Sequence, residues 1–299
     1  MDELAHPNAI RNPQDQNDDM ITIAIRTFNE EANITQCLRA ACQSFDDVVV
    51  IDQESKDRTL ELCKEFPVRV LSIQKFHSES EQLQWIAQHA PTPNGWIYFC
   101  DADEIIPPDL GAEIKAAIVA AESDVVAFAL RYKNYFCGRW IKHCGIYPVW
   151  VTRLFKVGHV HWERVTNTRA IVKGRTEYLD GHFEHYSFRK GIENWVAKHN
   201  LYSTGEAIEE AKASINMSGL ALVRDSVRRL RLRHDRRQAL KQLATLAPFR
   251  PMLRFIYMYV LKRGFLDGLA GFHYCMLLAF YEYMITLKRR EISSPPFGR

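Results

Sequence analysis

The chain has 299 residues, a formal net charge of +3, and 47% hydrophobic and 25% charged residues. This length suits one large α/β domain with an appendage, or two modest domains, and the composition is that of a globular protein with a real core. The small net charge argues against binding to nucleic acid through charge alone. The seven cysteines form no CxxC pair, so we expect buried, reduced thiols, although Cys137 and Cys144 flank a loop and could pair.

The first 19 residues are polar and rich in Asn, Asp, Gln and Pro, and they lack both a basic start and an apolar stretch. We therefore predict a disordered leader over residues 1–19, with no signal peptide. No clean transmembrane span follows, because the best apolar stretch, 265–287, is interrupted by Asp267, His273 and Glu282. These features predict a cytoplasmic protein.

From Met20 onward, short apolar runs alternate with segments of helical spacing. Four apolar residues in succession, 48–51, suit a parallel strand that is covered on both faces. The β-α-β-α-β-α-β order predicts an α/β fold with a mostly parallel sheet and helices on both faces. The strands are predicted at 21–25, 47–52, 68–73 and 96–100, and the helices at 30–44, 58–65 and 79–89.

The pattern changes after residue 104. A helix at 108–121 and a strand at 125–132 are followed by an aromatic- and His-rich stretch that predicts short mixed strands and loops to residue 188. Beyond that stretch the spacing is helical. We therefore predict an α/β domain over residues 20–190 and a C-terminal helical region over residues 191–299.

Polar residues follow three of the predicted strands, at 26–31, 52–57 and 101–104. Ligands of open α/β sheets bind beyond the carboxyl ends of the strands, so these segments are candidates for one site. Neither GxGxxG nor GxxxxGK follows the first strand, which disfavours a dinucleotide or P-loop cradle.

Asp101 and Asp103 are the strongest candidates for metal ligands among these polar residues. Residues two apart in an extended segment point to the same side, where two carboxylates repel each other unless a cation joins them. A divalent ion with phosphate oxygens as further ligands satisfies this arrangement. The alternative is an acidic helix N-terminus before Pro107 and Pro108.

Three segments, in this order, resemble glycosyltransferase family 2: Thr27 to Glu31, Ile51 to Thr59, and Trp96 to Glu104. The resemblance covers about residues 20–190, as a catalytic domain. It implies the GT-A fold, a nucleotide-diphosphate sugar donor, and inverting transfer assisted by Mg²⁺ or Mn²⁺. UDP is the donor nucleotide that the resemblance favours. Trp162-Glu163 and His185-Tyr186-Ser187 resemble the bacterial branch that glycosylates lipopolysaccharide core or similar envelope glycans.

The same resemblance implies roles by position. Asp101 and Asp103 would hold the metal and diphosphate, with Asp103 as the direct ligand, and His185 would cap that site. The sequence departs from the family at Gln53-Glu54 and lacks its basic residue within 82–84, for which Lys75 or Arg153 could substitute. The nucleotide pocket would be lined by Thr27, Asn29, Glu30, Asp52, Ser55, Asp57 and Asp101.

Inverting transfer needs a carboxylate base within hydrogen-bond reach of the acceptor hydroxyl. Glu163 matches the family's His-Glu pair, with Trp162 inserted, and Glu104 is the rival. The alternative for Glu163 is a surface ion pair with Arg164 or Arg153. His159 and His161 share a strand face, but no thiolate accompanies them as in a zinc site.

The C-terminal region contains a basic amphipathic segment, Arg224 to Lys241, and an aromatic-rich stretch over 249–287. Both suit contact with an anionic membrane, at the inner face of the cytoplasmic membrane and near a glycan or lipid-linked acceptor. A solvated helix face and packing within the protein are the alternatives.

Two other functions stay open from the sequence. A nucleotidyltransferase acting on a sugar phosphate also uses paired aspartates and a metal, but it would need a Gly-rich basic loop after the first strand. A membrane-peripheral scaffold would leave the acidic strand ends unexplained.

Overall fold

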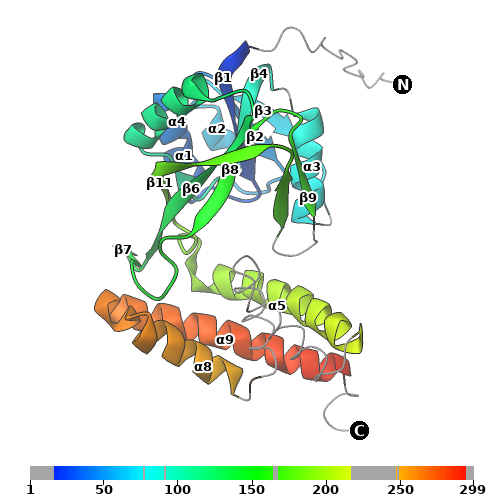
Figure 1. Ribbon diagram of the computed structural model, residues 1–299, viewed down its shortest axis with the longest axis vertical. Coiled ribbons are helices and arrows are strands. Elements are labelled where there is room, and N and C mark those ends of the chain that lie inside the picture. Colours follow the sequence, from blue (N-terminus) through cyan, green and yellow to red (C-terminus); the bar gives the residue numbers. More distant parts are fainter. Residues whose placement is uncertain are drawn as a thin grey trace. The chain divides into compact units, whose positions relative to one another are not determined.

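The computed structural model describes residues 17–76, 78–90, 92–163, 168–216, 247 and 249–293. The chain divides into two compact units, whose elements are labelled in Figure 1. The first unit comprises Met1–Leu130, Val151–Glu163 and Arg169–Phe183. The second comprises Arg131–Trp150, Arg164–Thr168 and Glu184–Arg299.

The first unit is built on parallel strands in the order β3-β2-β1-β4. All five residues of β2 are buried, and so are the first seven of the eight in β4. Such continuous burial requires cover on both faces of the sheet, as the apolar run 48–51 predicted. The strands are β1 (Asn17–Thr27), β2 (Val48–Asp52), β3 (Arg69–Ser72) and β4 (Asn94–Asp101).

The sheet continues from β4 through β8, β6, β11 and β5, and β8 runs antiparallel to β4. A separate antiparallel hairpin joins β9 to β10. These are the short mixed strands that the sequence predicted. Their bounds are β5 (Glu104–Ile105), β6 (Val125–Phe136), β7 (Arg139–Trp140), β8 (Trp150–Lys156), β9 (Val160–Glu163), β10 (Arg169–Val172) and β11 (Arg175–His185).

The helices of the first unit lie at the predicted places: α1 (Ile34–Ser44), α2 (Thr59–Cys63), α3 (Glu79–His89) and α4 (Pro108–Ala120). The helix α1 begins four residues later than predicted, because the Glu30 carbonyl accepts hydrogen bonds from the amides of Asn33 and Ile34 in a turn. The helix α3 is preceded by the N-cap residue Ser78, whose hydroxyl accepts a hydrogen bond from the Glu81 amide at 3.2 Å.

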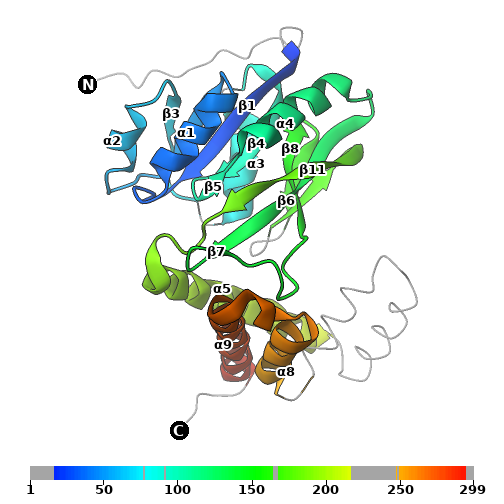
Figure 2. The same cartoon turned by 90° about the vertical axis from the view of Figure 1, so that its left-hand side faces the viewer.

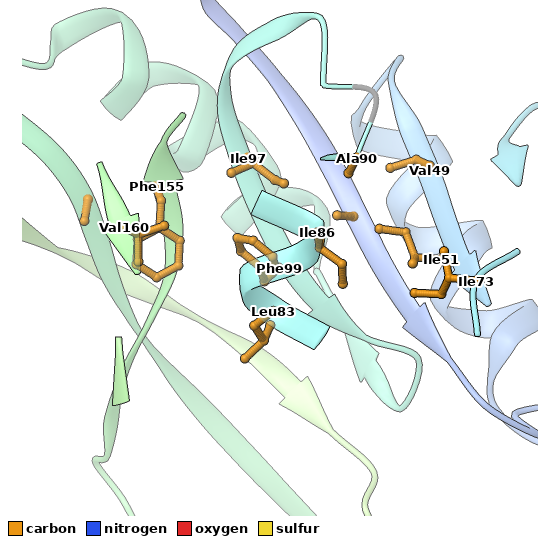
Figure 3. Packing of buried hydrophobic residues seen from close by; sticks show 12 residues of the cluster. Val49, Ile51, Ile73, Leu83, Ile86, Ala90, Ile97, Phe99, Phe155 and Val160 are labelled. Carbon is orange, nitrogen blue, oxygen red and sulfur yellow. The ribbon is translucent and has the colours of Figure 1, made fainter. Parts of the chain in front are cut away.

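Helices cover both faces of the parallel strands. In Figure 1, α1 and α4 lie to the left of these strands and α3 to the right. Alternation along a strand sends Ala24 to one face and its neighbours Ile23 and Ile25 to the other. Ala24 joins a buried cluster with Leu83 and Ile86 of α3, and Figure 3 shows both side chains of α3 directed at the sheet. This confirms the predicted α/β class.

The second unit contains the C-terminal helices. The helix α5 (Gly191–Asn216) packs against α9 (Gly268–Ser293), as does α8 (Arg250–Ile256), and α8 and α9 lie side by side in both Figure 1 and Figure 2. A π-helical turn, η2 (Tyr257–Leu261), and a 3-10 turn, η3 (Gly264–Asp267), connect α8 to α9. The predicted basic helix at 224–241 lies outside the described residues.

The cysteines agree only in part with the expectation of buried, reduced thiols. All seven cysteines are free: Cys137 is exposed, whereas Cys144 is buried with its sulfur 3.4 Å from that of Cys275. The pairing of Cys137 with Cys144 is therefore not formed. Within the described ranges, no helix is long and apolar enough to cross a membrane.

The packing of α3 generates a stability prediction. Replacing the fully buried Ile86 by Ala should lower the free energy of unfolding by about 2–5 kcal/mol, because it leaves a cavity between α3 and the sheet. Val119→Ala is the matched control, since Val119 is 70% exposed on α4 and its loss should change the value by less than about 0.5 kcal/mol. Urea denaturation followed by circular dichroism measures both, and equal effects would contradict the packing described.

Candidate active site

The register of the parallel strands brings the polar strand ends to one edge of the sheet. Thr27 at the end of β1 pairs with Asp52 at the end of β2. On the other side of β1, Arg26 pairs with Asp101 at the end of β4. The three segments that carry the resemblance therefore meet at the carboxyl ends of neighbouring strands, as the sequence predicted.

Asp52 is fully buried and holds two of these segments together. Its Oδ1 accepts from the Thr27 hydroxyl at 2.8 Å and from the Ser55 hydroxyl at 2.5 Å. Its Oδ2 accepts from the Ser55 amide at 2.9 Å. Three donors replace the water that this carboxylate loses on burial. Thr27 and Asp52 thus shape the floor of the site.

Asn29 links the loops that follow β1 and β2. Its amide donates to the Ser55 hydroxyl at 2.8 Å, and its side-chain Oδ1 accepts from the Lys56 amide at 2.7 Å. Asn29 has φ of 53°, in the left-handed region that asparagine tolerates better than most residues. Half-buried Asn29 and Ser55 therefore hold a fixed loop conformation while remaining partly open to solvent.

Glu30 and Asp57 complete this network. The Glu30 amide donates to the Thr59 hydroxyl at 2.7 Å, and its carboxylate accepts from the Asn33 side chain at 2.7 Å. Asp57 accepts from the amides of Glu31 and Thr59, both at 3.0 Å. Six of the seven residues expected to line a nucleotide pocket are thus brought together at one edge, and the seventh, Asp101, lies at the end of the neighbouring strand β4.

Gln53, where the sequence departs from the family, and Lys75, a candidate substitute for the missing basic residue, both contact the segments around the site. Gln53 accepts a hydrogen bond from the Phe76 amide at 3.3 Å, which ties the segment after β3 to β2. The Lys75 ammonium lies 4.4 Å from the centre of the Phe28 ring, a cation–π distance. Lys75 is thus held beside the β1 loop.

The acidic run does not form the extended segment that the sequence argument assumed. β4 ends at Asp101, Ala102 and Asp103 form a turn, and β5 begins at Glu104. Asp101 and Asp103 therefore flank a turn at the strand end, and the alternation of an extended chain does not apply to them. Both are partly open to solvent, whereas the Glu104 side chain is only 1% exposed.

Two arginines surround Asp101 and Glu104. Arg153 of β8 donates from Nη2 to Asp101 Oδ2 at 2.9 Å and also to Glu104 Oε1. Arg26 of β1 donates to the other oxygen of Asp101 and forms an ion pair with Glu79 at 3.1 Å. Arg153 was one of the two substitutes considered for the missing basic residue, whereas Arg26 was not singled out as a site residue.

Burial and charge act in opposite directions on these guanidiniums. Burial would lower the pKa of Arg153, but the carboxylates of Glu104 and Asp101 outweigh it and hold the pKa well above its usual value. The pKa of Arg26 is raised in the same way, with Asp101 and Glu79 opposing its burial. Burial, reinforced by Glu104, also raises the pKa of the nearby Tyr98 hydroxyl. The site therefore contains two fixed cations and a neutral phenol.

Nothing in the described ranges gathers three or more His, Cys, Asp or Glu as a complete set of metal ligands. Asp101 and Asp103 alone fit a hard cation that takes its remaining ligands from phosphate and water, as Mg²⁺ does at nucleotide sites. His159 places Nδ1 3.3 Å from the Lys173 carbonyl oxygen. His185 belongs to the second unit, where its ring meets Tyr132 edge-on.

Glu163 is the last residue of β9 and has a 61% exposed side chain. Its carboxylate lies 3.7 Å from His161 Nε2, on the same side of the strand. Trp162, between them, packs against Phe99 and Phe155 in the core. The alternative ion pair with Arg153 is not formed, and Arg164 lies outside the described residues. An exposed carboxylate is open to an acceptor, whereas the Glu104 carboxylate is buried and bound.

The sequence profile of Glycosyl transferase family 2 matches residues 22–193, more than half of the chain. The chain belongs to glycosyl transferase family 2. The protein is thus a glycosyltransferase, and its α/β sheet agrees with the GT-A fold that the resemblance implied.

Among curated proteins, the chain is similar to an uncharacterized glycosyltransferase of Rickettsia prowazekii, with 23% identity over 288 residues, or 91% of this chain and 87% of that protein. The prophage-derived glycosyltransferase SunS of Bacillus subtilis is 32% identical over 87 residues, or 28% of this chain and 20% of that protein.

Two solved structures are also similar. TarS 1–349 of S. aureus has a TM-score of 0.41 and 14% identity, over 94% of this chain and 93% of that one. Glucosyl-3-phosphoglycerate synthase from Mycobacterium tuberculosis, in complex with Mg²⁺ and uridine diphosphate, has a TM-score of 0.32 and 18% identity, over 38% of this chain and 43% of that one.

The cluster around Arg153 generates a prediction. Arg153→Met should lower the free energy of unfolding by about 3–5 kcal/mol, because it leaves the buried Glu104 carboxylate without this cation. Adding Glu104→Gln should recover part of the loss, since the remaining group is neutral. Arg175→Met is the matched control, because Arg175 pairs with three carboxylates at the surface and should matter by less than about 1 kcal/mol. Chemical denaturation of the parent and the three variants measures the effects. An Arg153→Met protein as stable as the parent would contradict the arrangement.

Proposed function

We propose that this glycosyltransferase transfers a sugar, with inversion, from a nucleotide-diphosphate donor to an envelope glycan or lipid-linked saccharide. We further propose a UDP-sugar as the donor and Mg²⁺ or Mn²⁺ as the assisting ion. The supporting observation is the pair Asp101 and Asp103 at a strand end, beside the buried cations Arg26 and Arg153. Acidic and basic groups at one edge suit a metal together with a doubly charged phosphate group.

The donor nucleoside would lie over the loops that follow β1 and β2. Asn29, Glu30, Ser55 and Asp57 are partly exposed there and are held in place by the hydrogen bonds described above. Thr27 and Asp52, being buried, would position this surface from beneath. A rigid pocket binds more tightly than a mobile one, because less conformational entropy is lost on binding.

The diphosphate would lie at the end of β4, where Asp101 and Asp103 would hold the metal, which when bound neutralises the charge that develops on the leaving group. Arg26 and Arg153 stabilise the same charge from the protein side. The Nε atoms of both arginines are buried, and they have no hydrogen-bond partner within the described ranges.

Glu163 would act as the base that removes the proton from the acceptor hydroxyl as that oxygen attacks the anomeric carbon. Its exposure and its position after Trp162 support this role over Glu104, whose carboxylate accepts from Arg153 and from the Asp101 amide. Glu104 would instead position the turn that carries Asp101 and Asp103.

The envelope or lipid-linked acceptor rests on the resemblance carried by Trp162-Glu163 and His185-Tyr186-Ser187. A place of action at the inner face of the cytoplasmic membrane follows from such an acceptor. It is supported by a second unit that exposes many large apolar side chains.

The metal and diphosphate assignment predicts a loss of binding. UDP with Mn²⁺, at a free ligand concentration 100 times Kd, should stabilise the parent protein by about 2.7 kcal/mol. Asp103→Asn should reduce this stabilisation in a thermal-shift measurement. Transfer should fall on the order of 100-fold or more, because a charge that stabilises the leaving group is weakened. The matched control Asp109→Asn changes an exposed aspartate in the first turn of α4 and should behave as the parent. Undiminished stabilisation in Asp103→Asn would contradict the proposal.

The base assignment predicts a loss of rate with binding retained. Glu163→Gln should lower kcat by about 10²- to 10⁴-fold and leave UDP binding unchanged, because the amide cannot take the proton. The control is Glu177→Gln, a carboxylate in the surface pairs of Arg175. UDP release from a panel of UDP-sugars, compared with calorimetric UDP binding, separates the two effects. A full rate in Glu163→Gln together with a low rate in Glu104→Gln would transfer the role to Glu104.

A further inference from the structure

The helical segment from Phe249 to Leu261 in the second unit exposes one continuous apolar face. The exposed residues recur at intervals of three and four, which places them on one side of a helix. Phe249 is 80% exposed and Leu261 is 68% exposed, so the face is open along its length. We call this face the apolar stripe; it consists of Phe249, Met252, Leu253, Ile256, Tyr257, Val260 and Leu261.

The opposite side of the same segment faces the protein and carries both apolar residues, such as the buried Met258, and charged ones. Arg250 is buried and forms ion pairs with Glu210 at 2.9 Å and with Glu282 at 2.6 Å. Arg254 also pairs with Glu282. A helix on the surface of a water-soluble domain directs its charged residues outward, whereas this segment pairs its two arginines within the protein and exposes seven large apolar side chains. The segment therefore presents to its surroundings the side that water solvates least.

The charge around the stripe has one sign. The sequence from Phe249 to Leu266 contains four basic residues and no Asp or Glu. Arg250 and Arg254 are neutralised internally, while Lys262 and Arg263 are exposed directly after Leu261. Apolar side chains bordered by basic ones suit the boundary between the acyl chains and the anionic headgroups of a membrane.

A bilayer fits these observations better than a second copy of the chain. Two copies related by a two-fold axis through the stripe would bring their own Lys262 and Arg263 together without opposing charge. Anionic headgroups offer the opposite charge. Since no described helix is both long and apolar enough to span a membrane, the segment would lie in the plane of the interface.

We propose that the apolar stripe docks the protein on an anionic lipid surface, with Lys262 and Arg263 at the headgroups. Phe265, Leu266 and Leu269 extend the exposed apolar surface beyond the stripe, and Leu269 is 77% exposed. The sequence had pointed to aromatic residues of this region in general, whereas Tyr274 is buried and Tyr259 packs against the core cluster of the unit. The docking surface needs no assumption about donor, acceptor or metal.

The test measures binding of the full chain to sucrose-loaded vesicles by sedimentation. One set is pure phosphatidylcholine, and the other contains about 30% phosphatidylglycerol as anionic lipid. The parent should bind the anionic set. Leu253→Ser with Leu261→Ser should weaken that binding roughly tenfold or more, because two apolar side chains no longer insert among the acyl chains of the lipid. Leu201→Ser is the matched control, since Leu201 is 72% exposed on α5 and lies outside the stripe.

The basic residues are tested separately. Lys262→Gln with Arg263→Asn should weaken binding to the anionic vesicles by about 10- to 30-fold and leave weak binding to phosphatidylcholine unchanged. Asparagine is chosen because Arg263 has φ of 56°, which asparagine tolerates. All variants retain residues 224–241, so any contribution of that basic segment is constant.

Three results would overturn the proposal: no binding of the parent to anionic vesicles, parent-like binding of the double serine variant, or a lipid-free dimer that this variant converts to monomer. The last result would assign the stripe to a second copy. None of these measurements uses a sugar nucleotide, so their failure is distinct from a failure of the proposed transfer reaction.

Discussion

The ion-pair cluster of Arg153 with Asp101 and Glu104 is the interaction on which the candidate site depends. Glu104 is almost completely buried, and a buried carboxylate persists only with a cation or several donors beside it. Arg153 supplies the cation from β8, so the antiparallel strand next to β4 is part of the site and not only an edge of the sheet. The turn between β4 and β5 owes its position to this contact and to the hydrogen bond from the Asp101 amide to Glu104.

The same logic governs the other half of the edge, where buried Asp52 takes the place of Glu104. There the partners are hydroxyl and amide donors instead of a guanidinium, so the loops after β1 and β2 are held by neutral hydrogen bonds. One carboxylate beneath each loop thus fixes the backbone, and the polar groups above remain partly exposed to solvent.

Sequence reasoning located the elements well because their signals are local. The apolar run at 48–51 and the helical spacing of Leu83 and Ile86 indicate burial without knowledge of the partners. Arg26 was missed because its pairing with Asp101 depends on the register of β1 against β4, which joins residues 75 positions apart. The sequence did not distinguish the apolar stripe from the other apolar residues of the region, because the packing of α9 decides which side of α8 is covered. The turn at Ala102 was read as extended chain because the strand before it is wholly apolar.

The exposure of the basic residues separates two electrostatic sites by their response to ionic strength. The side chains of Arg26 and Arg153 are 9% and 20% exposed, so dissolved ions approach them poorly and screen them little. Lys262 and Arg263 are exposed to solvent, where a Debye length of about 8 Å at physiological salt already screens their attraction to more distant charges. Rising salt would therefore loosen attachment to anionic lipid while the charges of the catalytic edge keep their strength. A single chain would in this way pass between surface-bound and free forms without losing the electrostatics of its active site.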